Sequence, residues 1–192
     1  MKFSYSWLCD HLETDKNAIE IGDALTNLGL ELESLTDYSS YSKFVVATIK
    51  DFHKHPNADR LNICTVDDGT KTYQVICGAN NVKKGLKGIF AKDGMYIPGT
   101  QIYLKKGKIR GEISEGMLLS ERELNLSDDH DGIIELSDNF ENGTSAIDAL
   151  KLNDPVFEIG ITPNRGDCLG VRGVARDLSA KGIGKLKPLK YE

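Results

Sequence analysis

The sequence has little of what marks several common protein classes. Its four cysteines, at positions 9, 64, 77 and 168, form no Cys-x-x-Cys pair, so their spacing suggests neither a zinc framework nor a redox motif. No apolar run approaches the ~20 residues that span a membrane, and glycine shows no three-residue period. The first eight residues interrupt their apolar side chains with serine, unlike a secretory signal. These absences predict a globular, cytoplasmic protein with reduced, buried thiols and no membrane partner.

Catalytic and metal-binding patterns are also absent from the sequence. No nucleophile with a matching base and no phosphate-binding loop can be recognised, and His53 and His55 lack a third metal ligand. The acidic loop from Ser127 to Asp138 imitates the ligand spacing of a calcium loop. It begins with serine and ends with aspartate instead of a bidentate glutamate, and no long helix follows it. We therefore predict no catalytic residue and no metal ligand.

The net charge of −5 conceals an uneven distribution of charge along the chain. Residues 1–42 hold 2 basic and 8 acidic side chains, 43–110 hold 13 and 5, 111–148 hold 1 and 11, and 149–192 hold 8 and 5. A basic block inside an acidic chain is typical of an electrostatic footprint for nucleic acid. The alternative is that the fold interleaves the basic and acidic blocks and cancels the footprint.

The two ends of the sequence share a pattern of helices and strands. Ser4 is expected to cap a short helix, and Thr14-Asp15 is expected to open a longer one that ends at Gly29. Residues 37–43 are polar and indicate a linker. Near the other end we expect a helix over 146–150, a strand over 156–161, and a helix capped by Asn164 that stops at Gly182.

The middle of the sequence predicts a succession of short strands. Alternating and β-branched runs recur from Phe44 to about Leu136, separated by turn signals such as Asp68-Gly69 and Pro98-Gly99. Regularly spaced short strands favour a small barrel or sandwich. We predict an α+β protein in which residues 1–38 and 150–192 form a discontinuous α+β domain, with an all-β domain over 39–149 inserted in it.

Four linked motifs lie in this central region. They are His55-Pro56-Asn57-Ala58-Asp59-Arg60-Leu61, Val66-Asp67-Asp68-Gly69, Cys77-Gly78-Ala79-Asn80-Asn81-Val82 and the segment from Ile113 to Leu124. In order and spacing they resemble the tRNA-binding domain shared by endothelial-monocyte-activating-polypeptide-like proteins, freestanding tRNA-binding proteins and certain aminoacyl-tRNA synthetases. Residues 1–8, 28–33 and 162–176 look like the amino-terminal region of bacterial phenylalanine–tRNA ligase beta subunits.

This resemblance implies a five-stranded oligonucleotide-binding barrel (OB-fold) inserted in the α+β domain, with tRNA as its partner. Such barrels bind RNA with basic grooves and stacking aromatic rings. The candidate stacking residues are Tyr73, Phe90, Tyr96 and Tyr103, although aromatic residues at strand positions are more typical of the core. The candidate phosphate contacts are Lys54, Arg60, Lys83, Lys84, Lys87, Lys105, Lys106, Lys108 and Arg110. Ser114 and Met117 match the segment that lies near RNA in the resembling domains.

The resemblance also implies a larger enzyme around this chain. A complete beta subunit is several times longer and works in an α₂β₂ assembly with an alpha subunit, which uses ATP and magnesium to join phenylalanine to its tRNA. We expect this portion to hold no cofactor and to serve as a structural and tRNA-binding module. Two alternatives stay open: a freestanding tRNA-binding protein, and a protein-interaction scaffold whose barrel touches no RNA.

Overall fold

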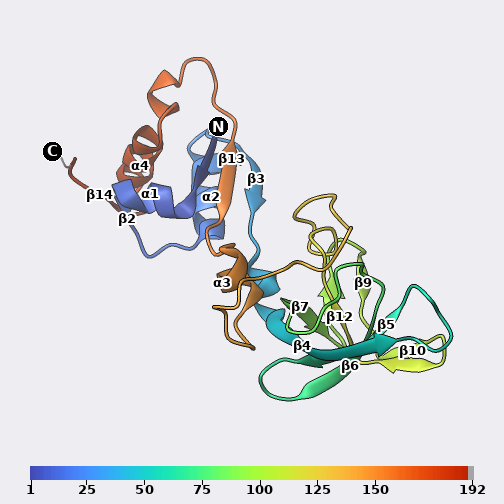
Figure 1. Ribbon diagram of the computed structural model, residues 1–192. Coiled ribbons are helices and arrows are strands. Elements are labelled where there is room, and N and C mark those ends of the chain that lie inside the picture. The colour runs from blue at the N-terminus through green and yellow to red at the C-terminus, as the bar shows by residue number, and fades with distance from the viewer. Residues whose placement is uncertain (190–192) are drawn as a thin grey trace. The chain divides into compact units, whose positions relative to one another are not determined.

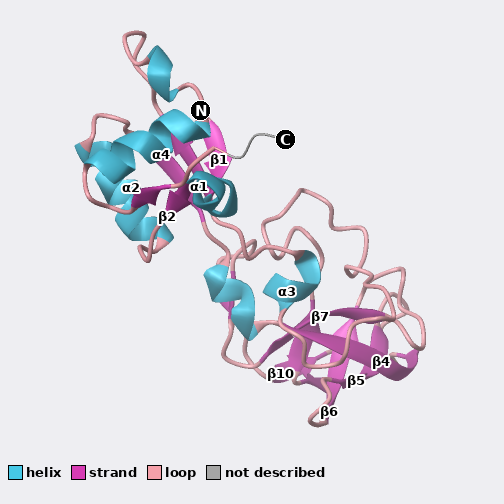
Figure 2. Cartoon of the chain, turned by 90° about the vertical axis from the view of Figure 1, so that its left-hand side faces the viewer, coloured by secondary structure: helices cyan, strands magenta, loops and turns pink. Residues whose placement is uncertain are grey.

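The computed structural model describes residues 1–189, which divide into two compact units (Figure 1). One unit combines Met1–Ser39 with the segment from Leu152 onward, and the other spans Ser40–Lys151. The boundaries expected from the sequence are 38/39 and 149/150. In Figure 2 the longer helices belong to the first unit and the large sheet to the second.

The first unit is a small α+β structure formed by the two ends of the chain. Its three-stranded antiparallel sheet has the order β1-β13-β3, and β2 pairs separately with β14. Its strands are β1 (Lys2–Ser4), β2 (Leu12–Glu13), β3 (Leu32–Thr36), β13 (Val156–Ile159) and β14 (Lys185–Leu186). Its helices are α1 (Tyr5–His11), α2 (Ala18–Asn27), the short 3-10 helix η2 (Gly166–Cys168) and α4 (Val171–Ala180).

Local signals explain where most of these helices begin and end. Ser4 caps α1 as expected by accepting a hydrogen bond from the Trp7 amide. Gly29, at a φ of 79°, ends α2 in the left-handed conformation that glycine adopts without strain. The buried faces of α2 and α4 meet Phe3 and Phe157, whose stacked rings lie 5.2 Å apart between centroids. Burial of this apolar face drives the packing of the two chain ends.

The second unit is built on a five-stranded antiparallel sheet with the order β12-β7-β4-β5-β6. These strands are β4 (Val45–Lys54), β5 (Asn62–Asp67), β6 (Thr72–Cys77), β7 (Lys87–Lys92) and β12 (Gly116–Leu118). Two hairpins extend from it: β8 (Tyr96–Ile97) with β9 (Ile102–Tyr103), and β10 (Gly107–Ile109) with β11 (Glu112–Ser114). The unit also contains α3 (Ala146–Leu150) and all but the first residue of the 3-10 helix η1 (Ser39–Lys43).

The sheet closes on itself because β6 meets the segment that joins β11 to β12. The Glu115 amide donates to the Gln74 carbonyl at 2.9 Å, and the Ile76 amide donates to Ser114 Oγ at 3.1 Å. Tyr73 and Phe90 fill the interior with ring centroids 4.9 Å apart. The nearly closed barrel and the helices of the other unit confirm the expected α+β class with an OB-like barrel.

Three sequence-based expectations about local structure are wrong. The second helix begins at Ala18, because Asn17 and Glu20 form a reciprocal capping box, while the Thr14 hydroxyl donates to the Ile183 carbonyl. Residues 37–43 are not simply a linker, since η1 places Tyr41 in the interior. The last long helix has Gly170 as its N-cap instead of Asn164.

Within residues 1–189, no helix combines the length and apolarity that crossing a bilayer requires.

Candidate nucleic-acid interface

The β10–β11 hairpin carries the densest group of exposed basic side chains in the barrel. Its two-residue turn consists of Arg110 and Gly111, at φ values of 54° and 100°. Positive φ at both turn residues matches the right-handed twist of the flanking strands, which keeps the hairpin tight. Lys108 and Arg110 therefore project from a defined backbone, and Lys105 and Lys106 immediately precede it.

The loop between β4 and β5 is pinned to this hairpin by His55. The His55 side chain is only 4% exposed, and its Nδ1 accepts from the Asn57 amide at 3.0 Å. The proton therefore lies on Nε2, which donates to the Ile109 carbonyl at 3.1 Å. Asn57 adds a longer bond from its Nδ2 to the Arg110 carbonyl. This loop, which lies beside β10 in Figure 1, follows Lys54 at the end of β4 and contains Arg60.

Acidic residues from the block 111–148 neutralise part of the predicted basic surface. Lys83 pairs with Glu135 at 2.6 Å, and Lys106 pairs with Glu115 at 2.7 Å. The hydrogen bond from Lys83 is the largest influence holding the pKa of Glu135 below its ordinary value, and Lys106 acts likewise on Glu115. The basic and acidic blocks of the chain are therefore partly interleaved by the fold.

The other two predicted lysines of the β6–β7 connection also have internal contacts. Lys87 Nζ donates to the carbonyls of Asp138 and Phe140 at 2.9 and 2.5 Å. Lys84 Nζ lies 3.9 Å from a carboxylate oxygen of Asp51, with both side chains largely exposed. These lysines are thus less available to an anionic ligand than their close spacing in the sequence implied.

Of the nine candidate phosphate contacts, five are exposed and keep no ionic or hydrogen-bonding side-chain partner among residues 1–189. We call them the basic patch: Lys54, Arg60, Lys105, Lys108 and Arg110. They come from the end of β4, the pinned loop that follows it, the β10–β11 hairpin and the segment just before that hairpin. Cations without internal partners attract phosphate most strongly, because no internal ion pair must be broken first.

The structure places Ser114 and Met117 differently from these cations. Ser114 is buried at the closure of the barrel, where its hydroxyl accepts from the Ile76 amide and donates to the Gly116 carbonyl. Met117 is half-buried and lines a hollow of about 210 Å³ together with Gly78 and Ala79. The motif residues therefore include one that closes the barrel and one at its surface.

We predict that Ser114→Ala lowers stability and leaves tRNA affinity unchanged. The substitution leaves the partly buried Ile76 amide without its acceptor, which costs about 1–2 kcal/mol. Urea denaturation measures that loss, and a binding titration under folding conditions measures affinity. A strong loss of affinity in a protein of unchanged stability would instead mean that this hydroxyl contacts RNA.

The aromatic candidates divide into an interior pair and a surface pair. Tyr73 and Phe90 are buried and belong to the core, so they are unavailable for stacking on a ligand. Tyr96 and Tyr103 are 44% and 67% exposed on the β8–β9 hairpin.

The acidic loop of residues 127–138 is organised by its own hydrogen bonds. Ser127 Oγ donates to Glu121, and Asp129 accepts from the Asp131 amide. Across from the loop, the Asn81 side chain holds both the amide and the carbonyl of Ile133. Within residues 1–189, this loop does not gather three metal-ligating side chains at coordinating distance.

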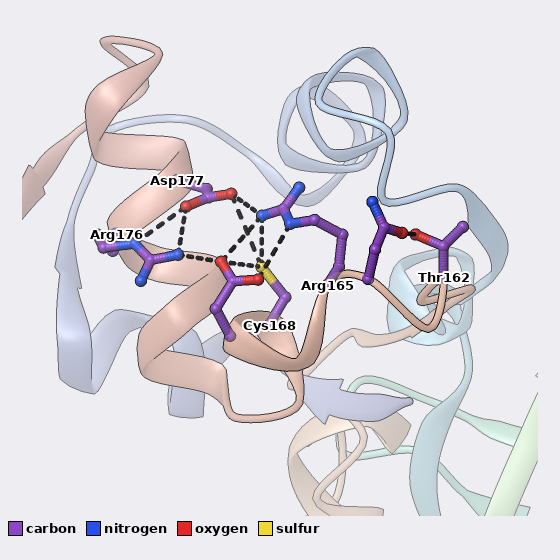
Figure 3. Close-up of polar contacts among 7 residues, drawn as sticks. Thr162, Arg165, Cys168, Arg176 and Asp177 are labelled. Atoms are coloured by element: carbon purple, nitrogen blue, oxygen red, sulfur yellow. Dashed lines mark hydrogen bonds and ion pairs between the residues drawn. The ribbon is translucent and has the colours of Figure 1, made fainter.

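Three possible metal ligands do come together in the first unit, next to two arginines. Asp167, Cys168 and Asp177 place their ligand atoms within 4.8 Å of one another. Arg165 and Arg176 each contact both carboxylates, as Figure 3 shows, and Arg165 also donates to the Cys168 sulfur. Burial raises the pKa of the Cys168 thiol to about 11, assisted by Asp177. The cluster is a closed salt-bridge network in which the carboxylates are already paired.

The same salt-bridge network holds the segment from Thr162 to Asp177 in its conformation. Asn164, expected to cap a helix, instead accepts from the Thr162 hydroxyl at 2.6 Å. The salt bridges hold η2 against α4, and Gly173 approaches so closely that an added Cβ would lie 1.8 Å from the Asp167 carbonyl oxygen. This segment therefore has a structural role that its motif alone did not reveal.

Sequence reasoning missed two residues that organise the barrel. His55 was dismissed for lack of further metal ligands, yet it fixes the basic patch. Asp68 was assigned to a turn, but its buried carboxylate binds Lys92 at 2.6 Å and Tyr73 at 3.0 Å. The strand pattern could have located both residues at strand ends, although Ile109 and Lys92, which they bind, are distant in sequence.

A nearly closed five-stranded barrel with unpaired surface cations is typical of the oligonucleotide-binding class of proteins. Residues 44–145, a little over half of the chain, match the family described as "Putative tRNA binding domain". The chain belongs to this family, as its motifs had indicated.

Similarity to longer proteins extends beyond the barrel. The chain is 51% identical to the phenylalanine–tRNA ligase beta subunit of Brucella abortus (strain 2308) over 97% of its length, and 52% identical to that of Paramagnetospirillum magneticum over 100%. It spans only 23% and 24% of these relatives. A "MetRS related protein" from Pyrococcus horikoshii gives a TM-score of 0.40 at 22% identity, covering 54% of this chain and 87% of that one.

Proposed function

We propose that this chain is the amino-terminal structural and tRNA-binding module of a phenylalanine–tRNA ligase beta subunit. In the whole enzyme it would support the ATP-dependent attachment of phenylalanine to its tRNA. The proposal is supported by the 51% and 52% sequence identity to the two beta subunits. This similarity covers both the barrel and the discontinuous unit around it. In this proposal, the catalytic residues of the enzyme would lie in its other parts.

The basic patch is the observation that carries tRNA binding. Its five side chains are exposed and lack internal partners, while neighbouring lysines pair with glutamates. The protein thus leaves uncompensated positive charge on one loop and one hairpin, although the net charge of the chain is −5. A localised cationic surface on an acidic protein favours a polyanion that docks at a defined place.

The remaining partners follow from the same proposal. The rest of the beta subunit and an alpha subunit would complete an α₂β₂ enzyme of the cytoplasm, and ATP and magnesium would bind there. The three-ligand cluster of the first unit does not fit magnesium, because Arg165 and Arg176 already occupy its carboxylates. In the proposed enzyme this module would contribute binding and support, with no step of the chemistry.

A salt titration of tRNA binding tests the proposal. If all five patch cations contact phosphates, the logarithm of the association constant should fall with the logarithm of salt at a slope of about −3.5 to −4.5. The chain is titrated with labelled tRNA at several salt concentrations, and a polyanion without bases serves as the control. Absence of binding even at low salt would contradict the proposal.

The two alternative functions predict different results in binding experiments. A freestanding tRNA-binding protein would bind tRNA in the same way but would not associate with an alpha subunit, which co-purification can determine. A protein-interaction scaffold would bind the ligase subunits without salt-dependent affinity for RNA. The unpaired cations of the basic patch favour the RNA-binding interpretation over the scaffold.

A further inference from the structure

The β8–β9 hairpin presents two neighbouring tyrosine rings to solvent. Tyr96 and Tyr103 are direct cross-strand partners, and their ring centroids lie 5.2 Å apart at an interplanar angle of 57°. They are 44% and 67% exposed, and neighbouring Ile102 is 54% exposed. Large apolar side chains that cluster on a surface are typical of a binding site.

The backbone beneath these rings is held firmly in place. The Gly99 amide donates to the Glu123 carbonyl at 2.8 Å, and an added Cβ on Gly99 would lie 1.8 Å from the Arg122 carbonyl oxygen. On the other side of the rings, two backbone bonds of 2.8 Å join Gly94 and Met95 to Leu104. The rings therefore stand on a rigid support, which reduces the entropy lost when a ligand binds.

Unpaired positive charge lies next to the tyrosines along the chain. Lys105 follows Tyr103 by two residues and belongs to the basic patch, whereas Lys106 is held by Glu115. Along the chain, the exposed ring of Tyr103 is thus followed by the unpaired cations Lys105, Lys108 and Arg110. This combination matches a nucleotide, which offers a flat base for stacking and a phosphate for the cation.

We propose that Tyr96 and Tyr103 form a stacking site for an unpaired base of bound RNA, with a flanking phosphate at Lys105. This inference rests on the proposed function and adds what the β8–β9 hairpin recognises. Such a site tolerates any base, because every base has a π-face. It discriminates instead between single-stranded nucleotides and a closed duplex, in which the bases stack on one another.

The test compares two RNA probes on variants of the tyrosine pair. An unstructured single strand of about 12 nucleotides suits the footprint of one such barrel, and a blunt-ended duplex of equal length is the second probe. Tyr103→Ala should weaken single-strand binding about 5- to 100-fold, as expected for the loss of one stacked base. Tyr103→Phe keeps the ring and should restore the affinity. The duplex affinity and the salt slope should not change, because the ring carries no charge.

A matched control and the possible outcomes separate this inference from the proposed function. Trp7 is 50% exposed in α1 of the other unit, and Trp7→Ala should leave single-strand binding unchanged. Wild-type affinity for the single strand in Tyr96→Ala and Tyr103→Ala would overturn the stacking site while leaving tRNA binding intact. An equal loss for strand and duplex would also overturn it. If the wild-type chain binds neither RNA, the proposed function fails as well, and the tyrosines become a surface for a protein partner.

Discussion

Reversing the charge of Lys105 and Lys108 to glutamate should weaken tRNA binding about 100-fold near 0.1 M salt. Each phosphate contact contributes close to one unit to the salt slope, so losing two contacts also reduces the slope by about two. Neither side chain has an ionic partner in residues 1–189, so the folded state loses no salt bridge. Fluorescence anisotropy with labelled tRNA at several salt concentrations measures both quantities.

The β6–β7 connection offers a control with the same change in net charge. Lys83 is already paired with Glu135, and Lys84 lies near Asp51. Lys83→Glu with Lys84→Glu should therefore reduce affinity several-fold less than the Lys105 and Lys108 pair. Equal losses in the two double variants would mean that tRNA responds to total charge, in contradiction to a localised basic patch.

Local sequence signals predicted much of the fold because their physical causes are local. Ser4 and Gly29 act on backbone groups within a few residues, and both were placed correctly. The same reasoning misplaced the start of α2, where the Asn17–Glu20 capping box competes with Thr14. Thr14 instead makes a bond to Ile183, a contact that no local pattern contains.

The sequence predicted the candidate cations of the interface, but it could not show which of them remain unpaired in the fold. Lys83 and Lys105 are equivalent by composition, and they differ only because Glu135 reaches one of them from 52 residues away. The aromatic candidates show the same limit. Alternation along a strand cannot decide whether Tyr73 or Tyr103 faces the interior, since the closure of the barrel and the added hairpins decide it. Long-range pairing thus determines which residues remain available to a ligand.

Asp68→Ala should destabilise the protein by about 2–4 kcal/mol at neutral pH, because it removes an almost completely buried, fully bonded carboxylate. Oδ1 of Asp68 accepts from the amides of Thr70 and Lys71 at 2.8 and 2.9 Å, while Oδ2 binds Tyr73 and Lys92. Lys92 ends β7, which is not a sheet neighbour of β6, so the ion pair ties parts of the barrel that share no ladder. Asp51→Ala, at an exposed carboxylate 3.9 Å from Lys84, is the control and should cost less than about 0.5 kcal/mol.

The pH dependence identifies the charge as the source of this stabilisation. Burial raises the pKa of Asp68, but the hydrogen bonds from Lys92, Thr70 and Lys71 outweigh it and hold the pKa well below its ordinary value. A carboxyl whose pKa is lower in the folded state stabilises the protein above its unfolded pKa of about 3.9, and that stability is lost as the pH falls toward the folded value. The stability difference between the wild type and Asp68→Asn should therefore be largest near neutrality and shrink below about pH 4. Urea denaturation of both proteins near neutral pH and below about pH 4 measures this stability difference. A difference that grows in acid would exclude a stabilising carboxylate at this position.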